Sequence, residues 1–92
     1  MARIIYRPTQ TNHRNGGLQH IYQFEDSWYS ASVIQTPYSY GGNVGLWELA
    51  VLLDGKITYN TPITHNHDVT GWLTDNDVQE ILAQIDTLTE AK

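Results

Sequence analysis

The residues best suited to metal chemistry are two histidines and an aspartate that lie close together in the sequence. His65, His67 and Asp68 offer two imidazoles and a carboxylate, which are donors that zinc and related divalent ions accept. Histidines two positions apart reach one metal only in an extended segment, and a further ligand from His13 or His20 would have to come from a distant part of the chain. We therefore expect a solvated loop here, predict no cofactor, and retain His65, His67 and Asp68 as the candidates for a metal site.

Patterns of nucleophilic and phosphate-binding chemistry are missing from the sequence. The chain has no cysteine and no serine in a nucleophile elbow of the type Gly-x-Ser-x-Gly. Gly41, Gly42 and Gly45 are not followed by the Lys-Ser or Lys-Thr pair of a phosphate-binding loop. The acids of the C-terminal part are expected on one solvated helix face rather than across a cleft. We predict that the protein is not an enzyme.

The segment 37–45 has an unusual composition, because two tyrosines stand beside three glycines. One interpretation is that the glycines only let the chain turn into the following strand. The other is that Tyr38 and Tyr40 project from the loop as anchors for a partner, since tyrosine offers a large contact area and loses few rotamers. Six Tyr, three Trp and one Phe are more than a small core hides, so we expect some aromatic side chains, including Trp72, on the surface.

A β-hairpin over residues 46–61 is the clearest element of the chain. Asp54-Gly55 supplies the two left-handed residues of a type I′ turn. The turn fixes a register in which three pairs face each other: Leu53 with Lys56, Leu52 with Ile57, and Ala50 with Tyr59. Strand 46–53 is apolar on both faces, so both must be covered. One helix covers only one face, and the other needs the N-terminal segment, a second copy or a partner.

Shorter segments complete the predicted sheet. Residues 20–24 and 28–34 are typical of strands joined by a turn, and residues 3–7 of a short strand ended by the proline that follows. The polar residues 8–19 are expected to form a mobile loop, and residues 65–71 a second loop.

An amphipathic helix is predicted near the C-terminus. Thr74 is its N-cap, and Asp77 completes an approximate capping box. Apolar residues recur at helical spacing: Val78, Ile81, Leu82, Ile85 and Leu88. This stripe must pack on the sheet, so the predicted fold class is α+β, an antiparallel sheet of about four strands with one helix on one face. Residues 1–92 are expected to form one domain, with 89–92 as a frayed tail.

Charge is distributed unevenly along the chain, whose net charge is −5. Residues 1–24 hold Arg3, Arg7 and Arg14 and no acid, whereas the part from Asp68 onward carries six acids against Lys92. Phosphate binding needs clustered Lys and Arg, so this acidic part disfavours direct contact with nucleic acid and suits a basic protein partner. No apolar stretch is long enough for a membrane span, so we expect no membrane partner.

Four segments carry a family resemblance: Tyr38–Gly42, Gly45–Leu52, Thr61–Thr64 and Asp68–Thr74. Together they resemble small uncharacterised proteins encoded by bacteriophages and prophages, over the chain from Tyr38 onward. The arginine-bearing N-terminal segment falls outside the resemblance. What it implies is a short, acidic, cysteine-free accessory protein of the host-cell cytoplasm. Many such proteins bind a host factor, anti-CRISPR proteins among them.

We therefore expect a non-enzymatic phage-type inhibitor that binds a host defence protein, with a CRISPR effector as the specific partner. Two sets of side chains are assigned to that role. The helix acids would oppose and occlude a basic surface, and the aromatic residues would be buried as anchors: Asp75, Glu80 and Asp86, and Tyr38, Tyr40 and Trp72.

The alternative is a homodimeric protein that binds a small ligand such as a signalling nucleotide. Aromatic side chains would stack on the ligand at the subunit interface, and Arg3, Arg7 or Arg14 would bind its phosphate.

Overall fold

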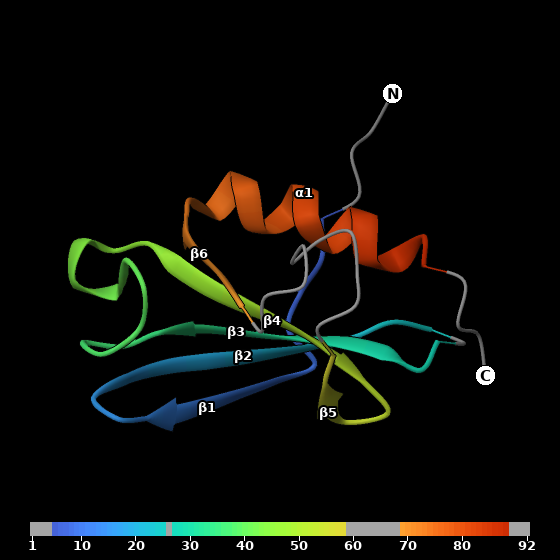
Figure 1. Ribbon diagram of the computed structural model, residues 1–92, viewed down its shortest axis with the longest axis horizontal. Coiled ribbons are helices and arrows are strands. Elements are labelled where there is room, and N and C mark those ends of the chain that lie inside the picture. Colours follow the sequence, from blue (N-terminus) through green and yellow to red (C-terminus); the bar gives the residue numbers. More distant parts are fainter. Residues whose placement is uncertain (1–4, 26, 59–68, 89–92) are drawn as a thin grey trace.

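An antiparallel sheet carries one α-helix on one of its faces (Figure 1). The computed structural model describes residues 5–25, 27–58 and 69–88. The helix is α1 (Asp75–Asp86), and the strands are β1 (Gln10–Arg14), β2 (Gly17–Gln23), β3 (Tyr29–Gln35), β4 (Trp47–Leu53), β5 (Lys56–Ile57) and β6 (Thr70–Leu73). The predicted α+β class is confirmed. Within these residues the sheet has six strands rather than about four, in the order β1-β2-β3-β4-β5, with β6 also paired to β4.

Two tight hairpins close the ends of the sheet. The predicted turn at Asp54-Gly55 joins β4 to β5, with φ of 52° and 79° at its two residues, as a type I′ turn requires. Its register is confirmed where the residues are described: Leu53 pairs with Lys56, and Leu52 with Ile57. The predicted partner of Ala50, Tyr59, lies outside the described residues.

The second hairpin corrects the prediction of a loop over residues 8–19. Most of that segment is β-structure, since β1 pairs antiparallel with β2 around the turn Asn15-Gly16. Both turn residues have a positive φ, 50° and 80°, so this is again a two-residue turn. The strand was missed because its five residues are all polar, and neither face shows the alternation that marks a half-buried strand.

Two further predictions, of a strand over residues 3–7 and of a loop over residues 65–71, are corrected. Residues 5–7 of the expected first strand are not in the sheet; instead Tyr6 lies against α1, and its ring meets Phe24 edge-on at 5.7 Å between centroids. Residues 65–68 of the predicted loop over 65–71 lie outside the described residues, and Thr70 and Gly71 belong to β6 rather than to a loop. β5 and β6 pair with successive halves of the same side of β4. The segments 20–24 and 28–34 are confirmed as β2 and β3, with slightly shifted bounds.

The core lies between α1 and the sheet. The capping box is confirmed, because the Thr74 hydroxyl accepts the Asp77 N–H and the Asp77 carboxylate accepts the Thr74 N–H. Every member of the predicted apolar stripe is buried in the core or packs against it. The sheet contributes alternate residues of β2, β3 and β4, the residue after β2 and the last residue of β6: Tyr22, Ala31, Val33, Leu49, Val51, Phe24 and Leu73. No helix in the described part of the chain is long and apolar enough to cross a membrane.

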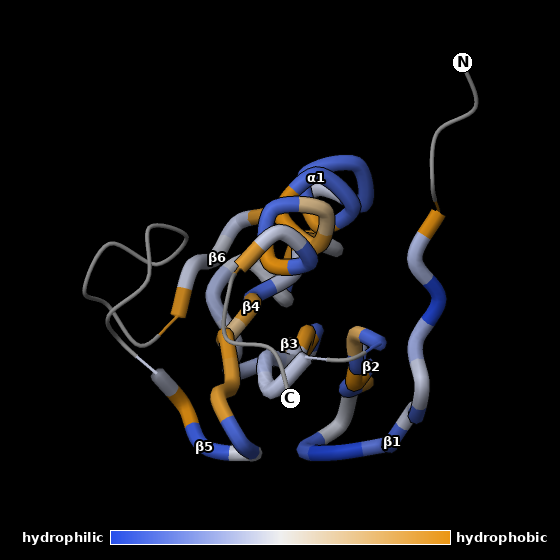
Figure 2. Tube along the Cα trace, turned by 90° about the vertical axis from the view of Figure 1, so that its right-hand side faces the viewer, coloured by the Kyte–Doolittle hydropathy of each residue, from blue (hydrophilic) through white to orange (hydrophobic). Residues whose placement is uncertain are grey.

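The opposite face of the sheet is open among the described residues. Figure 2, which looks along the strands, shows β1 and β5 farther from α1 than β3 is, so the sheet curves away from the helix. Its open face is therefore concave. The expectation that one helix leaves one face of β4 uncovered holds for the described residues.

Candidate functional site

Exposed apolar side chains gather on the loop between β3 and β4 and on the neighbouring β6. We call Tyr38, Tyr40, Val44 and Trp72 the aromatic patch; they are 86%, 61%, 67% and 62% exposed. They make up four of the seven large apolar side chains that are exposed among the described residues. The three aromatic anchors predicted from the sequence therefore lie in this patch, on two elements that are distant in the chain.

A network of short-range hydrogen bonds shapes the loop that carries the two tyrosines. Thr36 is buried, and its hydroxyl accepts the N–H groups of Tyr38 and Ser39 at 3.1 Å. The Ser39 hydroxyl in turn accepts the Thr36 N–H and donates to the Thr36 carbonyl. One carboxylate oxygen of Glu48, on β4, accepts the Tyr40 N–H at 3.0 Å. The loop is thus anchored to Thr36, which follows β3, and to Glu48 on β4.

Trp72 is held in a strained backbone conformation at a β-bulge. Trp47 pairs with Leu73 and Leu49 with Thr70, so two residues of β6, Gly71 and Trp72, stand opposite the single residue Glu48. Bulges of this kind turn a side chain out of the regular pleat. Trp72 has a φ of 60°, which is an outlier for a bulky residue.

The bulge also brings β6 against the tyrosine loop. The Trp72 N–H donates to the Tyr40 carbonyl at 3.3 Å. A Cβ at position 71 would collide with Cβ of Tyr40, so only glycine permits this approach. Tyr40 and Trp72 are therefore neighbours, each exposing a large part of its ring.

The three predicted helix acids do not form one face. At 100° per residue, Asp75 and Asp86 lie about 20° apart around α1, whereas Glu80 lies about 140° from Asp75. Asp75 accepts the indole N–H of Trp47 at 2.6 Å, and Asp86 accepts the Tyr6 hydroxyl at 2.8 Å. Asp75 and Asp86 therefore already serve the fold through one oxygen each, on the flank of the helix that meets Tyr6.

The carboxylates on this flank act on two tyrosines. Burial, the hydrogen bond to Asp86 and the charge of that carboxylate raise the pKa of Tyr6 to about 12. Burial and the charge of Asp75 raise the pKa of Tyr22. Both hydroxyls stay protonated at neutral pH, so these acids hold structure rather than activate a nucleophile.

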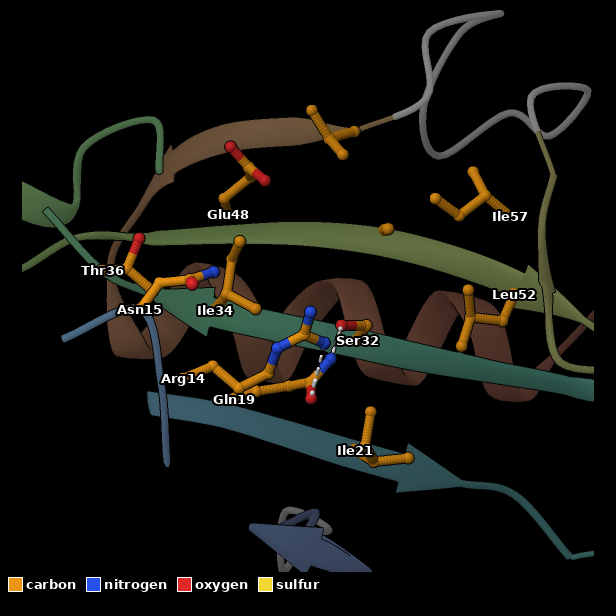
Figure 3. Close-up of a pocket in the computed structure, with 12 residues that line it drawn as sticks. Arg14, Asn15, Gln19, Ile21, Ser32, Ile34, Thr36, Glu48, Leu52 and Ile57 are labelled. Carbon is orange, nitrogen blue, oxygen red and sulfur yellow. Dashed lines mark hydrogen bonds between the residues drawn. The ribbon is translucent and has the colours of Figure 1, made fainter. Parts of the chain in front are cut away.

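The open face of the sheet carries a groove of about 300 Å³. We call this cavity the groove. Its apolar lining comes from β2, β3, β4, β5 and the residue before β6: Ile21, Ile34, Ala50, Leu52, Ile57 and Val69. Figure 3 shows α1 behind the sheet and the side chains of Ile21, Ile34, Leu52 and Ile57 in front of it, on the face away from the helix.

The polar residues of the groove gather toward one end. In Figure 3, Arg14, Asn15, Thr36 and Glu48 lie at that end, and Leu52 and Ile57 at the other. Between them, buried Gln19 donates to the Ser32 hydroxyl at 2.9 Å and accepts from Arg14 at 3.3 Å.

The histidine candidates give no metal site within the described residues. His65, His67 and Asp68 lie outside them. His20 stacks on Trp47 at 5.2 Å and meets Tyr22 edge-on at 6.3 Å between ring centroids. No group of three or more His, Asp or Glu side chains that could hold an ion occurs in the part of the chain that is described.

The groove was not predicted as a site, although the need to cover a second face of β4 was. Arg14 was named for phosphate binding, but its position opposite Glu48 depends on β1, which lacks a hydrophobic pattern. The asparagine–glycine pair at positions 15 and 16 is a strong hairpin signal and could have placed it.

No family model, no curated protein and no solved structure matches this chain. Its function must therefore be inferred from the aromatic patch and the groove themselves.

Proposed function

We propose that this protein binds a partner protein through the aromatic patch and catalyses no reaction. The observation that carries the proposal is Trp72, which combines a φ of 60° with a side chain that is 62% exposed. A non-glycine residue in this conformation costs roughly 1–3 kcal/mol, and such strain clusters at functional sites. Burial of the ring in the isolated protein does not repay this cost, whereas burial against a partner does.

The composition of the patch fits a protein interface. Tyr and Trp are enriched among the residues that dominate binding energy, because they bury much apolar surface and keep a polar tip. Tyr40 and Trp72 are also pre-positioned, by the Glu48 carboxylate and by the backbone bond between the two residues. Little conformational entropy is then lost when a partner closes over them.

Acidic groups beside the patch favour a basic partner. Glu48 contacts the backbone of Tyr40, and Asp75 follows Trp72 by three residues at the start of α1. Asp86 lies about 16 Å farther along the helix axis, so only a broad partner surface reaches both helix ends. These charges guide and orient the encounter, and the aromatic side chains supply most of the affinity.

The resemblance to phage accessory proteins supplies the proposed partner class. The protein would act as a phage-type inhibitor that binds a host defence protein, with a CRISPR effector as the specific case, and would occlude the Lys and Arg side chains that such an effector uses for nucleic acid. A partner surface with an apolar pocket surrounded by basic residues would be complementary to the aromatic patch and to the acidic residues beside it.

The test combines capture from a bacterial lysate with inhibition of target-DNA binding by a purified CRISPR effector–guide complex. The double variant Tyr40→Ala with Trp72→Ala should weaken capture and inhibition about a hundredfold or more, as loss of two anchors predicts. Trp28→Ala is the matched control, because Trp28 is a partly exposed aromatic residue outside the patch.

Three outcomes separate the parts of the proposal. Equal binding by the double variant and the wild type would remove the patch from the interface. Binding retained after Glu80→Lys and Asp86→Lys would remove the helix acids from the mechanism. A patch-dependent partner other than a CRISPR effector would keep the binding function and change the partner class.

A further inference from the structure

The groove on the open face combines an aliphatic floor with two charges that form no ion pair among the described residues. Arg14 donates to Gln19, and no acidic partner for its guanidinium occurs among the described residues. Glu48 accepts the Tyr40 N–H, and within the same described ranges its carboxylate meets no Lys, Arg or His. The two opposite charges line the same cavity without pairing with each other.

The sheet register sets the separation between the two charged walls. Gln19, which holds the Arg14 guanidinium, pairs with Ile34, and Ile34 pairs with Glu48. Two strand spacings therefore separate the charged walls, about 10 Å between backbones. The Arg14 and Glu48 side chains line the same cavity, so a ligand that lies between them can meet a guanidinium on one side and a carboxylate on the other.

The guanidinium is held in place before any ligand arrives. Gln19 is buried, and its side-chain oxygen accepts from both Arg14 and Asn12 while its amide donates to Ser32. Gln19 therefore links β1 to β3 across β2 and fixes the direction of the Arg14 side chain. Among the described residues the other guanidinium donors meet no acid, so they can bind an anion in the fork geometry that suits a carboxylate.

We propose that the groove binds a free α-amino acid with a branched aliphatic side chain. Arg14 receives the carboxylate and Glu48 the ammonium group. The side chain lies over the floor toward Leu52 and Ile57, at the apolar end seen in Figure 3. This site adds a ligand to partner binding by the aromatic patch, and it shares Glu48 with the loop that carries the patch.

Other small ligands fit the groove less well. A nucleotide base has nothing to stack on, because none of the described lining residues is aromatic. The carboxylate of a fatty acid can pair with Arg14 but adds a second anion near Glu48. The ammonium group of an aliphatic amine can pair with Glu48 but adds a second cation near Arg14. Only a ligand with both charges complements both walls.

The experiment titrates L-leucine into the full-length protein and follows methyl and amide signals by NMR. Two analogues each lack one charge, namely 4-methylpentanoate without the ammonium group and 3-methylbutylamine without the carboxylate. Leucine should bind at least tenfold more tightly than either, as expected for charge-assisted hydrogen bonds. Along the series alanine, 2-aminobutyrate and norvaline, affinity should rise about fourfold per methylene. Shifts should fall on Ile34, Ala50 and Ile57, and not on Val78 or Ile85 across the sheet.

Two variants assign the charges to their walls. Arg14→Met removes the proposed carboxylate partner, so this variant should bind leucine no more tightly than 3-methylbutylamine. Glu48→Gln removes the proposed ammonium partner, so this variant should bind leucine no more tightly than 4-methylpentanoate. Arg7→Met and Glu25→Gln are matched controls, because both residues are exposed and lie outside the groove. The circular dichroism spectrum and unfolding midpoint of each variant show whether its fold is intact.

Several results would overturn the proposal. They are the absence of leucine shifts at millimolar concentration, equal affinity for leucine and its two analogues, and variants that keep the wild-type preference. A dimer in sedimentation analysis whose interface buries Ile34 and Ile57 would show that a second copy fills the groove instead. A failed leucine titration leaves partner binding by the aromatic patch untouched, since that is measured with different variants.

Discussion

Trp72 is a residue whose backbone conformation opposes its side-chain type. Its φ of 60° suits glycine, yet a large aromatic side chain occupies the position and remains largely exposed. Three features impose this conformation: the bulge opposite Glu48, the bond to the Tyr40 carbonyl and the close approach of Gly71. The sequence could name Trp72 as a surface aromatic residue. It could not predict the strain, which arises only when β6 pairs with β4, a contact between distant segments.

The strain at Trp72 predicts an inverted order of stability for two substitutions. In an ordinary strand, alanine is more stable than glycine by roughly 0.5–1 kcal/mol. At position 72, the free energy of unfolding of the Trp72→Gly variant should be about 1 kcal/mol higher than that of the Trp72→Ala variant, because glycine adopts a positive φ without the Cβ clash. Urea denaturation of the two variants measures the difference.

The same pair of substitutions at Trp28 is the control, since Trp28 has no positive φ. There the alanine variant should be the more stable one. If alanine were also more stable at position 72, the bulge would not strain the chain as described.

Elements that depend on neighbouring residues, such as turns and helix caps, were predicted correctly from the sequence. Strands, which depend on pairing with other segments, were predicted only in part. The Asp54-Gly55 hairpin and the capped helix were predicted down to register and N-cap because turn and cap chemistry lies within a few residues. β1 and β6 were missed for different reasons. β1 is polar throughout and is held by side-chain bonds such as Asn12 to Gln19. β6 is a four-residue edge strand containing a glycine and a bulge.

The N-terminal segment shows how tertiary contacts replace an expected strand. The Gln79 side chain accepts the Tyr6 N–H at 2.8 Å and donates to the Tyr6 carbonyl at 3.0 Å, so an amide side chain on α1 takes the place of a neighbouring strand. The Tyr6 hydroxyl adds its bond to Asp86. Tyr6 therefore lies on the helix side of the sheet and not at the groove.

The contact between Tyr6 and α1 predicts a dependence of stability on alkaline pH. The pKa of Tyr6 rises from 10.0 to about 12 in the folded protein. A raised pKa means that the folded state holds the proton more tightly, so this stabilisation is complete below about pH 10 and is lost as pH rises toward 12. Tyr6→Phe should therefore lose less unfolding free energy than the wild type between pH 9 and pH 11.5, as measured by urea denaturation.

Tyr38→Phe provides the comparison for this measurement, because Tyr38 is exposed in the loop. It should keep the wild-type decline across the same pH range. A Tyr6→Phe variant that declines as steeply as the wild type would mean that the bond to Asp86 does not form.

On the scale of the whole molecule, the sheet separates two surfaces with different chemistry. α1 covers one face and builds the core, and the concave face keeps its aliphatic side chains for a ligand. The apolar character of β4 on both faces predicted this division. The location of the polar end of the groove could not be predicted, because Arg14 and Glu48 are brought together only by the order of four strands.

Glu48 belongs to both surfaces, since one carboxylate oxygen holds the Tyr40 N–H of the aromatic patch while its side chain lines the groove. We predict that saturating leucine shifts the Tyr40 amide signal and that Glu48→Gln removes this response. The Trp28 amide, outside both surfaces, is the reference and should not move. An unchanged Tyr40 signal at full occupancy would mean that the carboxylate does not transmit binding.

Because one carboxylate serves both surfaces, we expect ligand and partner binding to be thermodynamically linked. Any factor by which the amino acid changes the affinity for the partner must equal the factor by which the partner changes the affinity for the amino acid. The loop that carries Tyr40 would then transmit occupancy of the groove to the protein interface. The bulge opposite Glu48 would be the mechanical link between the two binding sites.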